Sequence, residues 1–298
     1  MSEEQIGAAQ SAQEQQPTKE EVLSKNELLA ALESDFATGA SKIFLNSVGQ
    51  EYAFREITVK EQKTLTRIIS GNENRKDVIY DAQCALINQA ALDKDFDIYR
   101  FSEFDRMKVL IALYQANMFQ NEVKFTCEEC GADNKYKVDF ESTLQKLDEY
   151  VLERKNHVYE TKKFKYEFEC EYPTVKLVSA FHKSYCARNG VNIPKRQVKG
   201  NNVMNNLEYV DLFIRSIRIK NLENGKDRFV ALRNYDVKDI EEILQAFPQD
   251  ALYSDAGVLK FIVDNYLKPV NESFGEHKCA HCGTVHNKEG SDNVESFF

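Results

Sequence analysis

Apolar residues recur along the chain with two different periods, and each change of period marks an expected element. A period near 3.6 is typical of a helix with one apolar face, and a period of two is typical of a half-buried strand. In the first half, the helical period appears in four segments: residues 25–36, 58–69, 77–92 and 102–118. The second of these begins with Thr58, followed three residues later by Glu61, which is a capping box at a helix N-terminus.

The period of two appears in the first half at two places. Residues 42–57 alternate around a turn at Gly49 and predict a pair of strands. Residues 123–126 and 136–140 alternate on either side of a Cys-Glu-Glu-Cys-Gly segment. This pattern predicts a β-hairpin whose tip is a cysteine knuckle.

The second half follows a similar order. Residues 166–170 predict a strand and residues 174–188 a helix, whereas residues 190–206 read as a loop and residues 207–219 fit either a helix or a strand. Asp236 is expected to cap a helix that runs to Phe247. A last helix over residues 255–267 leads into a second knuckle. The fold class we expect is α+β, with two similar helical halves that each end in a CxxCG knuckle.

The halves share short strings that suggest an internal duplication. Tyr114 matches Tyr266, and Cys127 matches Cys279, at the same spacing of 152 residues. Strings this short also match by chance, so duplication and coincidence both stay open. We expect three regions: a disordered acidic and Gln-rich tail over residues 1–25, a first half over 26–150 and a second half over 151–298. The helix after the tail could dock on the body or bind a partner.

Charge and composition narrow the possible functions. The chain of 298 residues has 39 basic and 48 acidic residues, a net charge of −9, which disfavours a main role in binding duplex nucleic acid. The basic residues that do cluster are residues 195–200, with Arg215, Arg218 and Lys220 nearby; a solvated loop is favoured over a contact with nucleic acid. No apolar run is long enough to span a bilayer, and the N-terminus lacks a secretory signal, so we expect a soluble, cytoplasmic protein.

Four of the seven cysteines form the two CxxCG units, Cys127 with Cys130 and Cys279 with Cys282. Four thiolates around one Zn²⁺ make a closed tetrahedral site, and each CxxC supplies half of it. The two halves lie about 150 residues apart, far more than in a local zinc ribbon. We therefore expect a single structural Cys₄ zinc site, built by tertiary contact, that clasps the two hairpin tips together. The three cysteines outside these units are expected to be small buried hydrophobic residues: Cys84, Cys170 and Cys186.

Three alternatives for the knuckles stay open. They could be redox pairs, although the glycine and the flanking hairpin are unlike a redox CxxC at a helix start. The second knuckle could bind its own ion with nearby histidines, whereas the first has only acidic neighbours. The metal could also have been lost. The residues concerned are His277, His281 and His286 at the second knuckle, and Glu128, Glu129 and Asp133 at the first.

No catalytic constellation accompanies the cysteines. Four thiolates leave no open coordination position for a substrate, which a catalytic zinc needs. The chain has no zinc-protease, zinc-deaminase, dinucleotide-binding, P-loop or nucleophile-elbow motif. We therefore expect a protein that is not an enzyme and has no small-molecule substrate.

The region from Ile43 to Phe140 resembles a family of phage proteins. Residues 54–61 read Phe-Arg-Glu-Ile-Thr-Val-Lys-Glu, and Cys127, Cys130 and Gly131 follow downstream. In this order they resemble the baseplate proteins of T-even-type contractile-tailed phages, the hub-assembly chaperones. The resemblance implies a non-enzymatic protein that builds the baseplate hub and binds other tail proteins. It would work in the host cytoplasm during assembly or remain in the virion tail baseplate.

Two other functions compete with this one. A zinc-ribbon regulator would bind nucleic acid or RNA polymerase, and would need a local basic face that the net charge makes harder to build. A redox or metal-transfer protein would use the two CxxC pairs chemically. Copurification distinguishes the baseplate protein from the zinc-ribbon regulator. A tail-protein partner supports the baseplate role, and salt-sensitive retention on DNA supports the regulator.

Overall fold

The computed structural model describes residues 24–38, 40–72, 75–116, 122–127, 129–189 and 211–286, and residues 1–38 and 39–298 form two separate units. In the first unit, α1 (Lys25–Thr38) confirms the helix predicted from residue 25. Ser24 caps it, since its hydroxyl accepts the N–H of Glu27 while the Glu27 carboxylate accepts the N–H of Ser24. Residues 1–23 of the predicted tail lie outside the described residues.

The first half of the second unit has the predicted elements in the predicted order. A hairpin of β1 (Ser41–Leu45) and β2 (Gln50–Phe54) is followed by three helices and a second hairpin. Both hairpins are antiparallel. The helices and the second hairpin are α2 (Val59–Gly71), α3 (Lys76–Ala90), α4 (Glu103–Ala116), β3 (Glu122–Thr126) and β4 (Asp133–Lys137).

The capping box at the start of α2 is confirmed in detail. The Thr58 hydroxyl accepts the N–H of Glu61 at 3.3 Å, and the Glu61 carboxylate accepts the N–H of Thr58 at 2.8 Å. Arg55 adds two hydrogen bonds to the same carboxylate, at 3.0 and 2.6 Å. Burial acts to raise the pKa of Glu61, but the bonds from Arg55 and Thr58 outweigh it and lower this pKa to about 2. Glu61 is therefore ionised at neutral pH.

A four-stranded antiparallel sheet, in the order β5-β6-β7-β8, forms the centre of the second half. Residues 207–219, which fitted either a helix or a strand, are described from residue 211 on. They form a 3₁₀ turn at Asp211–Phe213 and then a strand. The outer strands and the helix before the sheet were not predicted. The elements are α5 (Phe140–Asp148), β5 (Lys155–Glu160), β6 (Phe164–Cys170), α6 (Val175–Asn189), β7 (Ile214–Asn221) and β8 (Asp227–Ala231).

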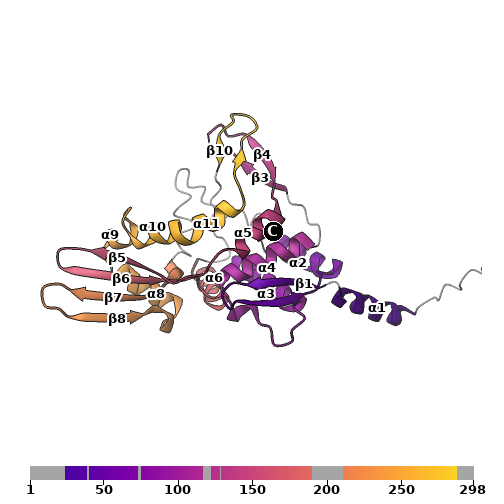
Figure 1. The fold of residues 1–298 in the computed structure, drawn as a ribbon, viewed down its shortest axis with the longest axis horizontal. Coiled ribbons are helices and arrows are strands. Elements are labelled where there is room, and N and C mark those ends of the chain that lie inside the picture. The colour runs from indigo at the N-terminus through magenta and orange to yellow at the C-terminus, as the bar shows by residue number, and fades with distance from the viewer. Residues whose placement is uncertain are drawn as a thin grey trace, which may run out of the picture. The chain divides into compact units, whose positions relative to one another are not determined.

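The C-terminal helices cover one face of this sheet (Figure 1). As predicted, Asp236 caps a helix, its carboxylate accepting the N–H of Asp239. The predicted last helix begins only after Gly257, where an added Cβ would lie 2.5 Å from the carbonyl oxygen of Leu252, and it continues past Leu267. The elements are α8 (Val237–Gln245), α9 (Gln249–Tyr253), α10 (Val258–Ile262), a π-helical turn (Val263–Leu267), α11 (Lys268–Ser273), β9 (His277–Lys278) and β10 (Val285–His286).

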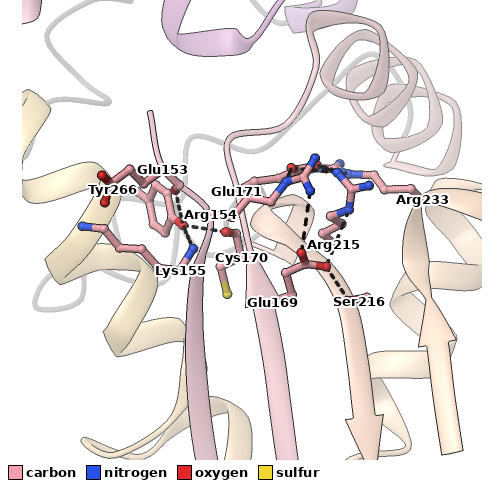
Figure 2. Close-up of polar contacts among 10 residues, drawn as sticks. All are labelled: Glu153, Arg154, Lys155, Glu169, Cys170, Glu171, Arg215, Ser216, Arg233 and Tyr266. Carbon is pink, nitrogen blue, oxygen red and sulfur yellow. Dashed lines mark hydrogen bonds and ion pairs between the residues drawn. The ribbon is translucent and has the colours of Figure 1, made fainter. Parts of the chain in front are cut away.

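The π-helical turn brings Tyr266 against the ends of the sheet strands. Its hydroxyl donates to the carbonyl of Cys170 at 2.6 Å and accepts the N–H of Lys155 at 3.1 Å, as Figure 2 shows. The carbonyl of Tyr266 in turn accepts the hydroxyl of Tyr172 at 2.6 Å. A π-helical turn interrupts the regular i→i−4 hydrogen bonds of a helix. Here the hydroxyl of Tyr172 supplies a hydrogen bond to one of the carbonyl groups in the turn.

Three apolar clusters form the core. The first joins β1, β2 and the helices of the first half to α6, and the second lies between the four-stranded sheet and α8–α10. The third joins α4 and α5 to α11, and its buried members are Phe104, Ile111, Val138, Phe140, Leu147, Val270 and Phe274. Two of the three clusters contain residues from both sides of residue 150. The predicted division into halves, and the duplication, stay predictions. Among the described residues, no helix combines the length and apolarity that crossing a bilayer requires.

Candidate metal centre

The two knuckles meet at the tips of their hairpins, β3–β4 and β9–β10, which lie side by side in Figure 1. All four predicted sulfur atoms lie within 4.8 Å of one another. Two distances across the knuckles are 3.6 Å, from Cys127 Sγ to Cys282 Sγ and from Cys130 Sγ to Cys279 Sγ. Tertiary folding therefore brings together side chains that are about 150 positions apart in the sequence.

These distances fit four ligands of one ion. A regular tetrahedron with Zn–S bonds of about 2.3 Å has S···S edges of about 3.8 Å. A disulfide would need a separation of about 2.05 Å, and all seven cysteines are free thiols. Four sulfurs in a tetrahedral arrangement are the donor set that zinc favours. The residues present therefore fit the predicted Zn²⁺.

The backbone shapes both knuckles in the same way. In the first, the N–H of Cys127 donates to Ala132 O at 2.9 Å, and the N–H of Gly131 donates to Cys127 O at 2.8 Å. Gly131 has φ +70°, a left-handed conformation that glycine adopts without strain. The second knuckle repeats both bonds and the left-handed glycine with Cys279, Thr284 and Gly283. The CxxCG spacing therefore encodes one local turn, made twice.

Asn134 links the two knuckles directly, although no motif in the sequence singles it out. This side chain belongs to β4 and is 7% exposed. Its amide nitrogen donates to Ala132 O at 2.8 Å and lies 3.4 Å from Cys279 Sγ, and its amide oxygen accepts the N–H of Ala280 at 2.9 Å. Such a partner behind the thiols would orient them for a bound ion.

Backbone N–H groups prepare some of the thiols for ionisation. The N–H groups of Cys282 and His281 lower the pKa of Cys279 to about 5. Thr284 lowers the pKa of Cys282 through its side chain and its N–H. The N–H of Ala132 acts in the same direction on Cys130, but burial and the neighbouring thiols raise this pKa to about 12. Four adjacent thiolates repel one another, so the full ligand set calls for a cation between them.

The alternative with a separate ion at the second knuckle finds limited support. Among the described residues, the one group of metal-ligating side chains that converges is the four cysteines. His281 is exposed and is not part of it. The side chains of His277 and His286 lie outside the described residues. The number of ions per chain stays a prediction.

The chain segments next to both knuckles pack in the third apolar cluster. Val138, just after β4, is 1% exposed, and Phe274, five residues before Cys279, is 5% exposed. The hairpin tips are thus held near each other by their bases as well as by the thiols. The three remaining cysteines are buried elsewhere, as predicted. Burial raises the pKa of Cys84 and of Cys170 to about 12, and it also raises that of Cys186.

Two arginines of the predicted basic region, Arg215 and Arg218, are paired with carboxylates in the structure. Figure 2 shows Arg154, Arg215 and Arg233 around the carboxylate of Glu171 at the end of the four-stranded sheet. Arg154 and Arg215 donate to it at 2.9 Å, and the Nε of Arg233 lies 3.5 Å away. Glu169 offers a second carboxylate to Arg215, at 3.6 Å.

Arg218 is paired as well, since its Nη1 lies 3.3 Å from the carboxylate of Asp227. Arg233 lies deeper than the other guanidinium groups, and burial lowers its pKa. Residues 195–200 lie outside the described part of the chain. Arg215 and Arg218, the two arginines that the sequence placed near this loop, are thus both paired with carboxylates.

Comparison with known proteins gives one result. A family model described as T4 bacteriophage base plate protein matches residues 40–298. No curated protein and no solved structure matches the chain. The match includes both knuckles and begins next to the boundary between the two structural units. It confirms the resemblance seen over residues 43–140 and extends it through the second half.

Proposed function

The chain belongs to the T4 bacteriophage base plate protein family, and from this premise we propose that it is a non-enzymatic structural or hub-assembly protein of a phage tail baseplate. The observation that carries the proposal is the family match over residues 40–298, in which both knuckles lie. Its partners are then other tail proteins, which it meets in the host cytoplasm during assembly. The zinc-ribbon regulator is not favoured by this match.

The four-thiol cluster supports a structural rather than a catalytic role. We propose that Cys127, Cys130, Cys279 and Cys282 bind one Zn²⁺. Four sulfur ligands fill a tetrahedral shell, so no position remains for a substrate or an activated water. The ion would fasten the hairpin of the first half to that of the second, and so fix the surface that the two halves present together.

Metal content per chain tests the site. We expect one zinc in the purified protein, and none after substitution of Cys127→Ser together with Cys279→Ser. His281→Ala is the matched control, because this exposed residue lies in the sequence between Cys279 and Cys282 without belonging to the cluster. Loss of zinc from this control would favour the local site with histidine ligands. Two ions per wild-type chain would contradict a shared site.

Complementation tests the baseplate role. A phage that lacks this gene is grown in cells that supply the wild-type protein or a variant, and infectious particles are counted. We expect the wild type and His281→Ala to restore infectivity, and electron micrographs without them to show incomplete tails. Complete, infectious tails in the absence of the protein would overturn the proposal.

Mass spectrometry of purified virions then separates the two forms of the role. Peptides of this chain in the particle indicate a structural subunit, and their absence, with assembly still dependent on the gene, indicates an assembly chaperone. Retention of the purified protein on DNA that is lost with rising salt, without any tail-protein partner, would instead support the regulator.

A further inference from the structure

The four thiols are arranged so that they can be joined covalently across the two knuckles. We propose that, once the metal is lost under oxidising conditions, Cys127 forms a disulfide with Cys282 and Cys130 forms one with Cys279. Both pairs have their sulfurs 3.6 Å apart and both run between the knuckles; the two thiols within each knuckle also interact, since all four sulfurs lie within 4.8 Å of one another. The inference rests on the proposed function only for its starting state, the metal-bound cluster.

Exposure divides each pair in the same way. Cys130 and Cys282 are exposed, whereas Cys127 and Cys279 are only 1% and 2% exposed. Each 3.6 Å contact therefore joins an accessible thiol of one knuckle to a shielded thiol of the other. A soluble oxidant reaches the accessible sulfur first, and the shielded sulfur is already in place to react with the product.

The chemistry balances with a peroxide as oxidant. The thiolate of Cys282 attacks one peroxide oxygen, so that an S–O bond forms, the O–O bond breaks and hydroxide leaves. The thiolate of Cys127 then attacks the sulfur of this sulfenic acid; the S–S bond forms, the S–O bond breaks and a second hydroxide leaves. Both hydroxides take protons and become water. One peroxide accepts the two electrons of each disulfide, so two peroxides oxidise all four thiols.

The exchange of a metal for disulfides suits a particle that passes between compartments. Thiols stay reduced in the cytoplasm, where assembly takes place, and disulfides persist outside the cell. A zinc bridge and a pair of cross-knuckle disulfides connect the same two hairpins. The connection between residues 127–130 and 279–282 is thus preserved after the ion has gone.

Peptide mapping of the full-length protein tests this inference. The metal is removed with a chelator, hydrogen peroxide is added, free thiols are blocked, and the unreduced protein is digested with trypsin. Cleavage after lysine yields residues 125–135 with Cys127 and Cys130, and residues 279–288 with Cys279 and Cys282. We expect these two peptides as one covalent species, four hydrogens lighter than their sum, that separates on reduction.

Disulfides within each knuckle would overturn the inference, because they leave two separate peptides that are each two hydrogens lighter. Unreacted thiols in both peptides would overturn it as well. The fully buried Cys84 and Cys170 serve as internal references that should carry the blocking group only after denaturation.

Two double variants resolve which sulfurs pair. Cys127→Ser with Cys282→Ser leaves the 3.6 Å pair Cys130 and Cys279, and this variant should cross-link faster than Cys127→Ser with Cys279→Ser. An equal or reversed order would overturn the assigned pairing.

Zinc measured in the untreated sample keeps the two proposals apart. If the untreated protein contains zinc, but only disulfides within each knuckle form after chelation and oxidation, the cross-link is refuted and the metal site is not. Cross-linking in a protein purified without zinc refutes the metal site and leaves the cross-link standing.

Discussion

The cluster of Cys127, Cys130, Cys279 and Cys282, which we call the clasp, and the third apolar cluster connect the same two parts of the chain by different physical means. The cluster joins α4 and α5 to α11 through side chains that are almost fully buried, such as Phe104 at 1% exposed and Phe274 at 5%. The clasp lies at the hairpin tips, where two of the four clustered cysteines are exposed and β9 and β10 have two residues each. Burial holds the first connection, whereas most of the described side chains at the hairpin tips of the second are exposed.

The difference shows why a metal would be used at one place and not at the other. A hairpin with such short strands buries too little apolar surface to offset its own ordering entropy. A bound ion supplies that stabilisation through directional ligand bonds. Substitutions of buried side chains should weaken the apolar cluster, and chelators should not. Chelators should weaken the clasp, and substitutions in the apolar cluster should hardly affect it. The predictions below test this separation, from the largest expected effect to the smallest.

Substitution of Cys127→Ser and Cys130→Ser, both in the first knuckle, should release the ion from the second knuckle too. Zinc should fall from one per chain to none, and the amides of residues 277–286 should lose their hydrogen-exchange protection, because an ion held by two thiolates alone is bound weakly. Metal analysis and hydrogen exchange by mass spectrometry measure both. Retention of an ion and of protection at residues 277–286 would mean that the knuckles are independent.

Truncation of Phe104→Ala should weaken the apolar cluster and leave the clasp's response to chelators unchanged. Phe104 stacks on Tyr150 and makes an edge contact with Tyr172, with ring centroids 5.2 and 5.4 Å apart. Removing such a buried ring costs about 3–5 kcal/mol. Denaturant unfolding with and without chelator measures the loss, which should be equal in both. A loss that disappears in chelator would show that the two connections are coupled.

Replacement of Asn134→Ala should weaken metal binding without removing a ligand. The substitution leaves the N–H of Ala280 without its acceptor and frees the position of Cys279. Loss of a partner behind metal ligands costs about 10–100-fold in affinity. Competition with a chromophoric chelator measures this. Zinc affinity equal to that of the wild type would show that Asn134 does not position the site.

The capping box of α2 gives a local effect far from either connection. Glu61 has a pKa of about 2, below its ordinary value of 4.5, so its ionised form stabilises the fold above pH 4.5. This contribution should be lost as the pH falls from about 4.5 to 2. Glu61→Gln should make stability less dependent on pH over this range, with zinc content at neutral pH unchanged. Thr58→Ala should cost about 1 kcal/mol.

What the sequence could predict depends on how local the information is. Thr58 and Glu61 specify a helix start within four residues, and the CxxCG spacing specifies a knuckle within five. That the knuckles meet was predictable, because each offers two thiols, half of the four that a tetrahedral Zn²⁺ site takes. Asn134 was not, since its role arises only when the second knuckle lies against it.

The missed strands have a different cause. β5 and β8 are the outer strands of the sheet, each with one neighbouring strand, and about half of the residues in each are exposed. Their polar sequences give little alternation, so their strand character comes from pairing with β6 and β7. The last helix was misjudged because its π-helical turn interrupts the regular period while the helix continues.

The distance of 152 residues between the knuckles also sets an order in time. A ribosome adding about 5–20 residues per second exposes the second pair of thiols roughly 8–30 s after the first. Until then the nascent chain offers only half a coordination shell, and a product that terminates early never completes it. Closure of the four-sulfur site therefore reports that translation has reached the second knuckle.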